Sequence, residues 1–258
     1  MSFDGLDISI LGPAFAAGLL VLATHVPLGQ EVLKRGIIFI DLAIAQIAGL
    51  GVVIASRFGG EAHGWEVQLT AMLSALLGAW LLSRMEKKWK RRQEALIGVT
   101  FVLAATASIL LLADNPHGGD SLKQLLVGQI LWVTWDQLII PALFSALILG
   151  VWFKVNHRSG YAGFYLLFAI AVTVSVQLVG IYLVFASLIV PSLGAVGLSG
   201  RRALLQGYLI GVFGYGLGLA ASAILDLPSG AVIVWAIVVV SLTGQVFIKD
   251  SQIIDKGA

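Results

Sequence analysis

Long apolar runs separated by short polar segments constrain this chain more than any other feature of its sequence. Of its 258 residues, 59% are hydrophobic and only 12% are charged, and the mean hydropathy is +0.96. A run of about 20 apolar residues can cross a bilayer as a helix, which satisfies its own backbone hydrogen bonds in lipid. The sequence therefore predicts an all-α, polytopic transmembrane helix bundle, with residues 1–258 forming a single transmembrane domain.

The apolar runs predict about nine spans. We expect them near residues 9–28, 37–56, 66–83, 95–113, 137–153, 161–176, 178–198, 203–224 and 229–247. The sixth and seventh form one continuous run that is too long for a single span, and we divide it at Ser175 to Gln177. Residues 116–135 are too short and broken to span, and they predict an outer loop followed by an interfacial helix, with Trp132 and Trp135 at headgroup depth.

The basic residues predict the orientation, because cytoplasmic loops are enriched in Lys and Arg. With an odd number of spans, all 16 Lys and Arg residues except Arg57 and Lys123 fall on one side. We therefore expect the N-terminus outside and the C-terminus in the cytoplasm. Because the basic residues form short clusters between spans, the lipid bilayer is an expected partner and nucleic acid is not.

Two polar residues interrupt the second predicted span, in the stretch FIDLAIAQIAGLG at 39–51. Asp41 is a carboxylate and Gln46 an amide, among residues otherwise suited to lipid. A charged side chain at bilayer depth costs about 3 kcal/mol on insertion scales, so it is usually paired or functional. Two interpretations stay open: the residues line a pathway, or they form an interhelical polar pair that serves packing.

Motifs of soluble enzymes are absent, and no catalytic residue is predicted. No P-loop is present, and the absence of cysteine excludes disulfides and thiolate metal sites. The sequence GLSG at 197–200 is superficially similar to intramembrane serine proteases. However, we expect every histidine to lie at a span end or in a loop, which leaves Ser199 without a base; the four are His25, His63, His117 and His157.

Two polar clusters in the predicted outer loops have residue types that could bind a divalent metal. They are Glu61, His63, Glu66 and Asp114, His117, Asp120. The same residues are ordinary in an outer loop, so both interpretations stay open. Prolines in spans are a separate signal, since a broken helix at bilayer depth can line a pathway or serve packing. Pro191, in the seventh span, is our candidate for such a break.

Four patches, in order along the chain, resemble one family: the membrane permeases of ATP-binding-cassette importers for zinc, manganese and iron. They are PLG at 27–29 leading into FIDLAIAQIAGLG, EALIGVTF at 94–101, LLVGQILWVTWDQL at 125–138 and LVGIYLVFASLIVPSLGA at 178–195. The sequence PSG at 228–230, before the last span, also fits the family. The resemblance covers nearly the whole chain.

The departures from the family pattern concern the polar residues. Such permeases usually carry Gly-Asp-x-Leu-x-His in the second span; here Asp41 falls at the glycine, Leu42 at the aspartate and Gln46 at the histidine. Gln129 stands where relatives have aspartate or serine. The resemblance implies that Asp41, Gln46 and Gln129 are the metal-contacting residues of the pathway. Because amide oxygens are neutral and weaker donors, substrate handling is expected to differ.

A second departure lies between the fifth and sixth spans. Relatives carry there a longer cytosolic segment that resembles the helix docking onto the ATPase subunit, whereas this chain has only FKVNHRSGYAGF at 153–164. Docking is then expected to use Lys154, His157 and Arg158, together with the basic loop SRMEKKWKRRQE at 83–94.

The resemblance implies a permease subunit for divalent metal ions, zinc or manganese, in the inner (plasma) membrane. It implies ATP-driven alternating access with three protein partners: a second copy of the chain, a separate ATPase subunit and an extracytoplasmic metal-binding protein. ATP hydrolysis would reside on the ATPase subunit, so the chain itself is not expected to be an enzyme or to bind a cofactor. Two alternatives remain: a transporter or channel that works without an ATPase, suggested by the short inner loop, and a non-transporting membrane scaffold, suggested by the altered polar sites.

Overall fold

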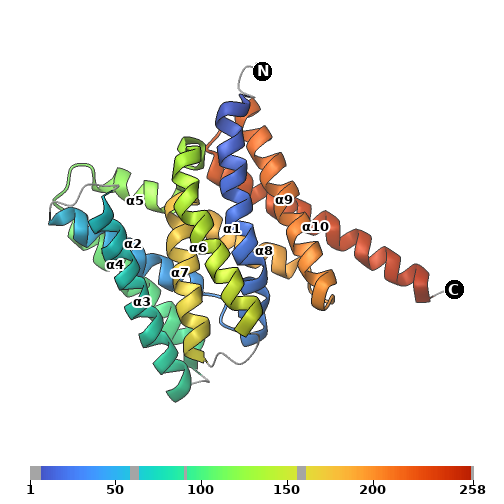
Figure 1. Cartoon of the computed structure of the whole chain (residues 1–258), viewed down its shortest axis with the longest axis horizontal. Helices are drawn as coiled ribbons and strands as arrows, with labels where there is room; N and C mark the ends of the chain where they lie inside the picture. The colour runs from blue at the N-terminus through green and yellow to red at the C-terminus, as the bar shows by residue number, and fades with distance from the viewer. Residues whose placement is uncertain (1–6, 59–63, 90–91, 156–160, 257–258) are drawn as a thin grey trace.

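The chain folds into helices throughout the part that the structure describes. The computed structural model describes residues 7–58, 64–89, 92–155 and 161–256 (Figure 1). These residues form ten α-helices, one short 3-10 helix, η3, and no strand. The helices are α1 (Ile8–Arg35), α2 (Ile40–Arg57), α3 (Trp65–Lys88), α4 (Gln93–Leu112), α5 (Gly118–Val127), η3 (Ile130–Trp132), α6 (Trp135–Val155), α7 (Tyr161–Val179), α8 (Ile181–Leu193), α9 (Gly200–Leu225) and α10 (Ser229–Lys256). The predicted all-α class is confirmed.

Each of the nine predicted spans coincides with one α-helix. Within the described residues, six helices are long and apolar enough to cross a membrane: α1, α2, α3, α4, α6 and α9. Three shorter apolar stretches, 163–179, 181–193 and 229–245, belong to α7, α8 and α10. The remaining helix, α5, with η3, lies where the interfacial helix was expected, and the side chains of Trp132 and Trp135 are exposed there. The number of crossings and their orientation stay predictions.

Two predicted boundaries were wrong. Helix α7 continues through Ser175 to Gln177 and ends at Val179, because the chain turns at Gly180, whose φ of 82° favours glycine. Helix α1 runs seven residues beyond the expected end at 28. Pro27 removes only one hydrogen bond from α1, and the helix ends instead at Gly36, which caps it in the left-handed conformation.

The helices form two groups that pack mainly within themselves. The first group, α2, α3, α4 and α7, lies at the left of Figure 1, where α2 packs on α3 and α4, and α3 on α7. The second group, α1, α8, α9 and α10, has α1 packed on α8 and α9, and α10 packed on α8 and α9. Helix α6 contacts both α1 and α7. We call these the α2 group and the α1 group.

Close backbone approach holds the α1 group together. A Cβ at Gly29 of α1 would overlap the backbone carbonyl of Leu188 in α8, and one at Gly18 would overlap the ring of Tyr215 in α9. Two hydrogen bonds join the same helices: the hydroxyls of Ser187 and Tyr215 lie 2.9 Å apart, and Tyr208 donates to the Ala23 carbonyl at 3.1 Å. Lipid provides no hydrophobic drive for helix association, so such contacts specify the packing.

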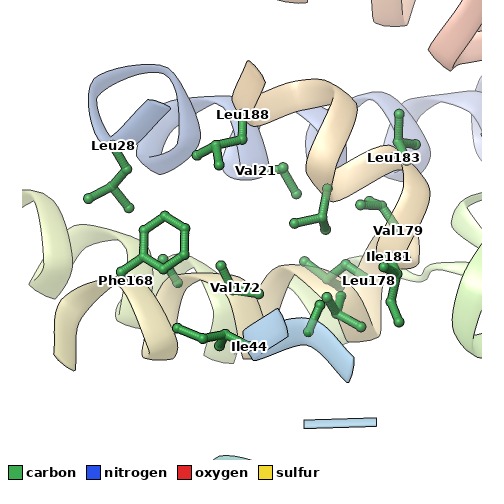
Figure 2. Close-up of a cluster of buried hydrophobic side chains, with 14 of the residues drawn as sticks. Val21, Leu28, Ile44, Phe168, Val172, Leu178, Val179, Ile181, Leu183 and Leu188 are labelled. Atoms are coloured by element: carbon green, nitrogen blue, oxygen red, sulfur yellow. The ribbon is translucent and has the colours of Figure 1, made fainter. Parts of the chain in front are cut away.

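An apolar seam separates the two groups. Figure 2 shows Val21 and Leu28 of α1 with Leu188 of α8, facing Phe168 and Val172 of α7, with Ile44 of α2 beside them. All six side chains are buried and none can form a hydrogen bond. We call this contact the seam. The two connections that pass directly between the groups, α1 to α2 and α7 to α8, turn at Gly36 and Gly180, both with positive φ.

The two ends of the bundle differ in charge. Successive long helices run in alternating directions (Figure 1), so α1 and α3 end where α2, α4, α7 and α9 begin. This end, which we call the basic end, carries exposed Lys34, Arg84, Arg92, Lys154, Arg201 and Arg202. The opposite, acidic end carries exposed Asp7, Glu66, Asp114, Asp120, Asp136 and Asp226.

Replacing Gly29 with Ala is expected to destabilise the fold. The added Cβ would meet the Leu188 carbonyl oxygen, which belongs to the backbone and cannot rotate away as a side chain can. Overpacking a close contact costs about 1–3 kcal/mol. The temperature of thermal unfolding in detergent, followed by tryptophan fluorescence, should therefore fall.

Gly150→Ala in α6 is the matched control for this substitution. No atom lies within 4 Å of a Cβ built at Gly150, and Ala is about 1 kcal/mol more favourable than Gly inside a helix. Gly150→Ala should leave the unfolding temperature unchanged or raise it. An unchanged temperature for Gly29→Ala would contradict the close contact between α1 and α8.

Candidate functional site

The start of α2 lies at the basic end and is tied to α4. The N-cap residue Phe39 has no side-chain cap of its own. Its backbone N–H donates instead to a carboxylate oxygen of Glu94, in the first turn of α4, at 3.1 Å. The other carboxylate oxygen of Glu94 is buried without a hydrogen-bond partner among the described residues.

Asp41 lies in the first turn of α2 and is fully buried, with 0% of its surface exposed. Neither carboxylate oxygen has a hydrogen-bond partner within the part of the chain that the structure describes. The positive end of the helix dipole offsets part of the cost of burying a charge, typically about 1 kcal/mol. The remaining cost of an unpaired buried carboxylate is several kcal/mol. A residue kept at that cost is a candidate for a functional role.

Gln46 lies on a different face of α2 from Asp41. Five positions along an α-helix correspond to a rotation of about 140°, whereas residues three or four apart share a face. Gln46 is 8% exposed, and Gly49, one turn further on its face, approaches Leu125 of α5. Asp41 and Gln46 therefore do not point in the same direction.

Gln129 lies far along the bundle from Asp41. It is exposed and sits in the connection between α5 and η3, at the acidic end, whereas Asp41 lies at the basic end. The structure therefore does not bring Asp41, Gln46 and Gln129 together into one site. Each of them stays a predicted pathway residue in its own right.

Pro191 lies in the last turn of α8 and is buried. Proline cannot donate a backbone hydrogen bond, and α8 ends two residues later at Leu193. Two side chains of α10 donate hydrogen bonds to backbone carbonyls there. The Ser241 hydroxyl donates to the Val190 carbonyl at 3.4 Å, and the Gln245 amide donates to the Leu193 carbonyl at 3.1 Å. Pro191 thus lies at a packed helix end, and its part in a pathway stays a prediction.

Of the three residues predicted for ATPase docking, only Lys154 is described. It lies near the end of α6 at the basic end, and its side chain is exposed. His157 and Arg158 lie outside the described residues. The connection that contains them is short, since α6 ends at Val155 and α7 begins at Tyr161.

The acidic-end metal cluster expected as one alternative is not formed. Among the described residues no three His, Cys, Asp or Glu side chains lie where they could hold a metal ion. Instead, a carboxylate oxygen of Asp114 lies 4.0 Å from a guanidinium nitrogen of Arg57. The backbone N–H of His117 donates to the side-chain oxygen of Asn115 at 2.9 Å. The metal interpretation of Asp114, His117 and Asp120 is therefore wrong. Glu61 and His63, in the other cluster, lie outside the described residues.

A buried polar cluster at the basic end was not predicted from the sequence. Gln93 of α4 donates to the Tyr165 hydroxyl of α7 at 2.6 Å, and Glu86 of α3, which is 5% exposed, also interacts with that hydroxyl. Arg35 of α1 bonds Glu31 at 2.9 Å and stacks over the Phe164 ring at 4.3 Å. The cluster joins the ends of α1, α3, α4 and α7. The sequence contained one signal for this cluster: a few acidic residues occur among the basic residues of the segments expected on the cytoplasmic side.

The expectation that His25 lies at a span end was wrong, because α1 continues to Arg35. His25 is fully buried, with 0% exposed. Its ring Nδ1 lies 3.0 Å from the Val21 carbonyl and 3.0 Å from the Thr24 hydroxyl, and Nε2 has no partner among the described residues. The other buried polar atoms without a partner there belong to residues of the basic end: Gln30, Asp41, Glu86 and Glu94.

Comparison with known families identifies one match. The profile of the ABC 3 transport family matches residues 7–159 and 154–248, which include every helix of the bundle except the end of α10. A metal transport system membrane protein of Chlamydia pneumoniae is 23% identical over 257 residues, covering 89% of this chain and 86% of that protein. The manganese transport system membrane protein MntC of Halalkalibacterium halodurans is 26% identical over 250 residues, covering 89% of this chain and 84% of that protein.

Two solved structures share the fold. PsaBC from Streptococcus pneumoniae, solved in complex with Fab, superposes with a TM-score of 0.73 at 20% identity, covering 93% of each chain. A metal-chelate type ABC transporter in an inward-facing conformation superposes with a TM-score of 0.65 at 17% identity, covering 86% of this chain and 80% of that one. The arrangement of helices is therefore shared with these two solved chains.

Replacing Tyr165 with Phe is expected to destabilise the basic end. The substitution removes the hydroxyl that accepts from Gln93 and leaves the amide of Gln93 and the buried Glu86 without that partner. A buried polar group that loses its hydrogen bond costs about 1–3 kcal/mol. The unfolding temperature in detergent should fall.

Tyr182→Phe in α8 is the control, because the Tyr182 side chain is 52% exposed. It should leave the unfolding temperature unchanged. Equal temperatures for the wild type and Tyr165→Phe would show that the cluster contributes nothing to stability.

Proposed function

The chain belongs to the ABC 3 transport family, and we propose that it is the membrane-spanning permease subunit of an importer for a divalent metal ion, manganese or zinc, in the plasma membrane. The observation that carries the proposal is the extent of the family match, residues 7–159 and 154–248, over the described bundle. The names of the two relatives, one a metal and one a manganese transport protein, support the class of substrate. Carboxylate and amide oxygens are suitable donors for manganese, and imidazole suits zinc.

The two helix groups suit the alternating-access mechanism of such importers. An apolar seam can open and close without breaking hydrogen bonds, since only dispersion contacts and apolar burial hold the two helix groups together there. The two connections between the groups turn at Gly36 and Gly180, where glycine adopts a positive φ because it has no Cβ. ATP binding and hydrolysis on a separate subunit would then bias the bundle between outward and inward openings.

Asp41 is the proposed cargo contact in α2. Its carboxylate is buried and unpaired, and a metal cation crossing the bundle would supply the charge that the described residues do not. Gln46 and Gln129 are proposed as weaker oxygen contacts at other levels of the passage. Weak ligation suits a conduit, because a passage must release what it binds.

Three partners complete the proposed importer: a second copy of the chain, an ATPase subunit at the basic end and an extracytoplasmic metal-binding protein at the acidic end. The exposed Lys154, with His157 and Arg158 of the short α6–α7 connection, would contact the ATPase. The cationic surface of the basic end complements an acidic docking segment.

Asp41→Asn tests the cargo contact. The substitution keeps the shape of the side chain and removes its charge, so manganese or zinc uptake by cells should fall about tenfold or more. Removing an unpaired buried charge should leave the unfolding temperature unchanged or raise it. Uptake is measured with the radioactive ion at equal protein abundance.

Asp226→Asn is the matched control for that substitution, because Asp226 is an exposed acid at the acidic end with a positive φ that Asn adopts readily. Its uptake should equal that of the wild type. Normal uptake by Asp41→Asn would remove Asp41 from the pathway.

Charge reversal tests the docking surface. The double substitution Lys154→Glu with Arg158→Glu should reduce the amount of ATPase that copurifies in detergent, because like charges would then face each other. Lys123→Glu, an exposed residue near the acidic end, is the control and should copurify normally.

One observation favours a second candidate, a transporter that works without an ATPase: only five residues separate α6 from α7. The same copurification decides between the two. A wild-type chain that never retains an ATPase, while metal uptake persists without cellular ATP, would favour the second candidate.

A further inference from the structure

We propose that His25 is a further cargo-binding residue, which the opening of the seam presents to the metal ion. The inference rests on the proposed function, since the cargo is the ion that the importer moves. It concerns a different helix, α1, and a different helix group from the Asp41 contact.

The first observation is the state of the imidazole ring. Nδ1 lies 3.0 Å from the Val21 carbonyl, one turn earlier in the same helix, and a carbonyl can only accept a hydrogen bond. The proton is thereby assigned to Nδ1, which leaves a lone pair on Nε2. Metal-ligating histidines typically have the same arrangement, in which a carbonyl or carboxylate fixes one ring nitrogen and the other is free to bind.

The second observation is that this free nitrogen is buried and unpaired. His25 is 0% exposed, and Nε2 has no hydrogen-bond partner among the described residues. A buried polar atom without a partner typically costs about 1–3 kcal/mol. An apolar side chain of similar size would fill the same space without that cost, so packing alone does not explain an imidazole here.

The third observation is the position of His25 on α1. It lies four residues after Val21 and three before Leu28, and residues at these spacings share one face of a helix. Both neighbours lie in the seam, opposite Phe168 and Val172 of α7 (Figure 2). By the same rule His25 also lies three residues after Leu22 and four before Gly29, which pack on α9 and α8. His25 therefore lies at the edge of the seam, where movement of the α2 group would uncover it.

The side of α1 that packs on α9 provides the contrast. Leu22 and Val26 pack against Gly211 and Gly207 of α9, inside the α1 group. A close backbone contact at Gly29 joins α1 to α8, and the hydrogen bond from Tyr208 to the Ala23 carbonyl joins α1 to α9, so these interfaces should stay closed while the seam opens. Only the seam side of the helix, with His25 at its edge, is then presented to the passage.

The chemistry of binding balances without any further reactant. The lone pair of Nε2 forms one bond to the divalent ion and displaces one of its water molecules, and the proton stays on Nδ1. Imidazole nitrogen is a good ligand for zinc and an adequate one for manganese. Release restores the unpaired nitrogen, which returns to the apolar seam as it closes.

A single cysteine tests the opening directly, because the chain has no cysteine of its own. His25→Cys and the control Val26→Cys each place one thiol in α1, and the two adjacent side chains point about 100° apart. Cells that carry the complete transport system are treated with an impermeant methanethiosulfonate reagent, with and without depletion of ATP. The thiol at position 25 should react several-fold faster in energised cells, and the thiol at position 26 should not react in either state.

His25→Leu tests the binding role, with Leu22→Met as the matched control in the same helix. His25→Leu should lower manganese or zinc uptake about tenfold or more, while its unfolding temperature stays equal or rises because an unpaired nitrogen is lost. Leu22→Met conserves volume and should transport normally.

The outcomes separate the inference from the function on which it rests. A wild-type chain that imports metal, with His25→Leu importing equally well or with position 25 never labelled, overturns the role of His25 alone. A wild-type chain that imports no divalent metal with its complete system overturns the proposed function and the inference with it.

Discussion

The absence of water from the bilayer core is the constraint on which the rest of this structure depends. Every backbone N–H and C=O in lipid must be paired within the protein, and helices do so within one segment. The constraint acts most strongly where helices end. At the close of α8, the hydroxyl of Ser241 and the amide of Gln245 give the Val190 and Leu193 carbonyls a second hydrogen bond besides those from backbone N–H groups. At the start of α2, a carboxylate oxygen of Glu94 accepts from the backbone N–H of Phe39.

Helices contact one another in two ways: through close, hydrogen-bonded contacts within the α1 group and through apolar contacts between the two groups. The second kind is the one at which the groups can move apart. Inside the α1 group, Gly29 brings α1 against the backbone of α8, and Ser187 and Tyr215 bond across helices. Between the groups, the side chains that pack across the seam are apolar, such as Phe168, and His25 lies at its edge. Directional contacts resist sliding and separation, whereas dispersion contacts can be remade against other apolar surfaces. The overall arrangement of helices is shared with the two solved structures on which the chain superposes.

A few buried polar atoms lower the stability of the fold because they have no hydrogen-bond partner among the described residues. These atoms lie along the proposed path of the cargo. Buried side-chain atoms without a hydrogen-bond partner in the described part of the chain belong to Asp41 and Glu94, at the basic end, and to His25, at the edge of the seam. Such atoms are costly where no ion or proton reaches them. In a permease they are understandable, because the closed state is only one of the states in which these side chains must function.

The sequence by itself determined the helices, the family and the polar residues worth testing, because hydropathy and spacing are properties of single segments. Asp41 was found in this way, and each expected span coincided with a helix. The tertiary structure alone decided what lies beside each residue. It showed that Asp41 and Gln129 do not form one site, joined Gln93 to Tyr165 across 72 positions, and buried His25, which was expected at a span end, at the edge of the seam. Periodicity gives the face and length of a helix, but its partners depend on packing between segments distant in the chain.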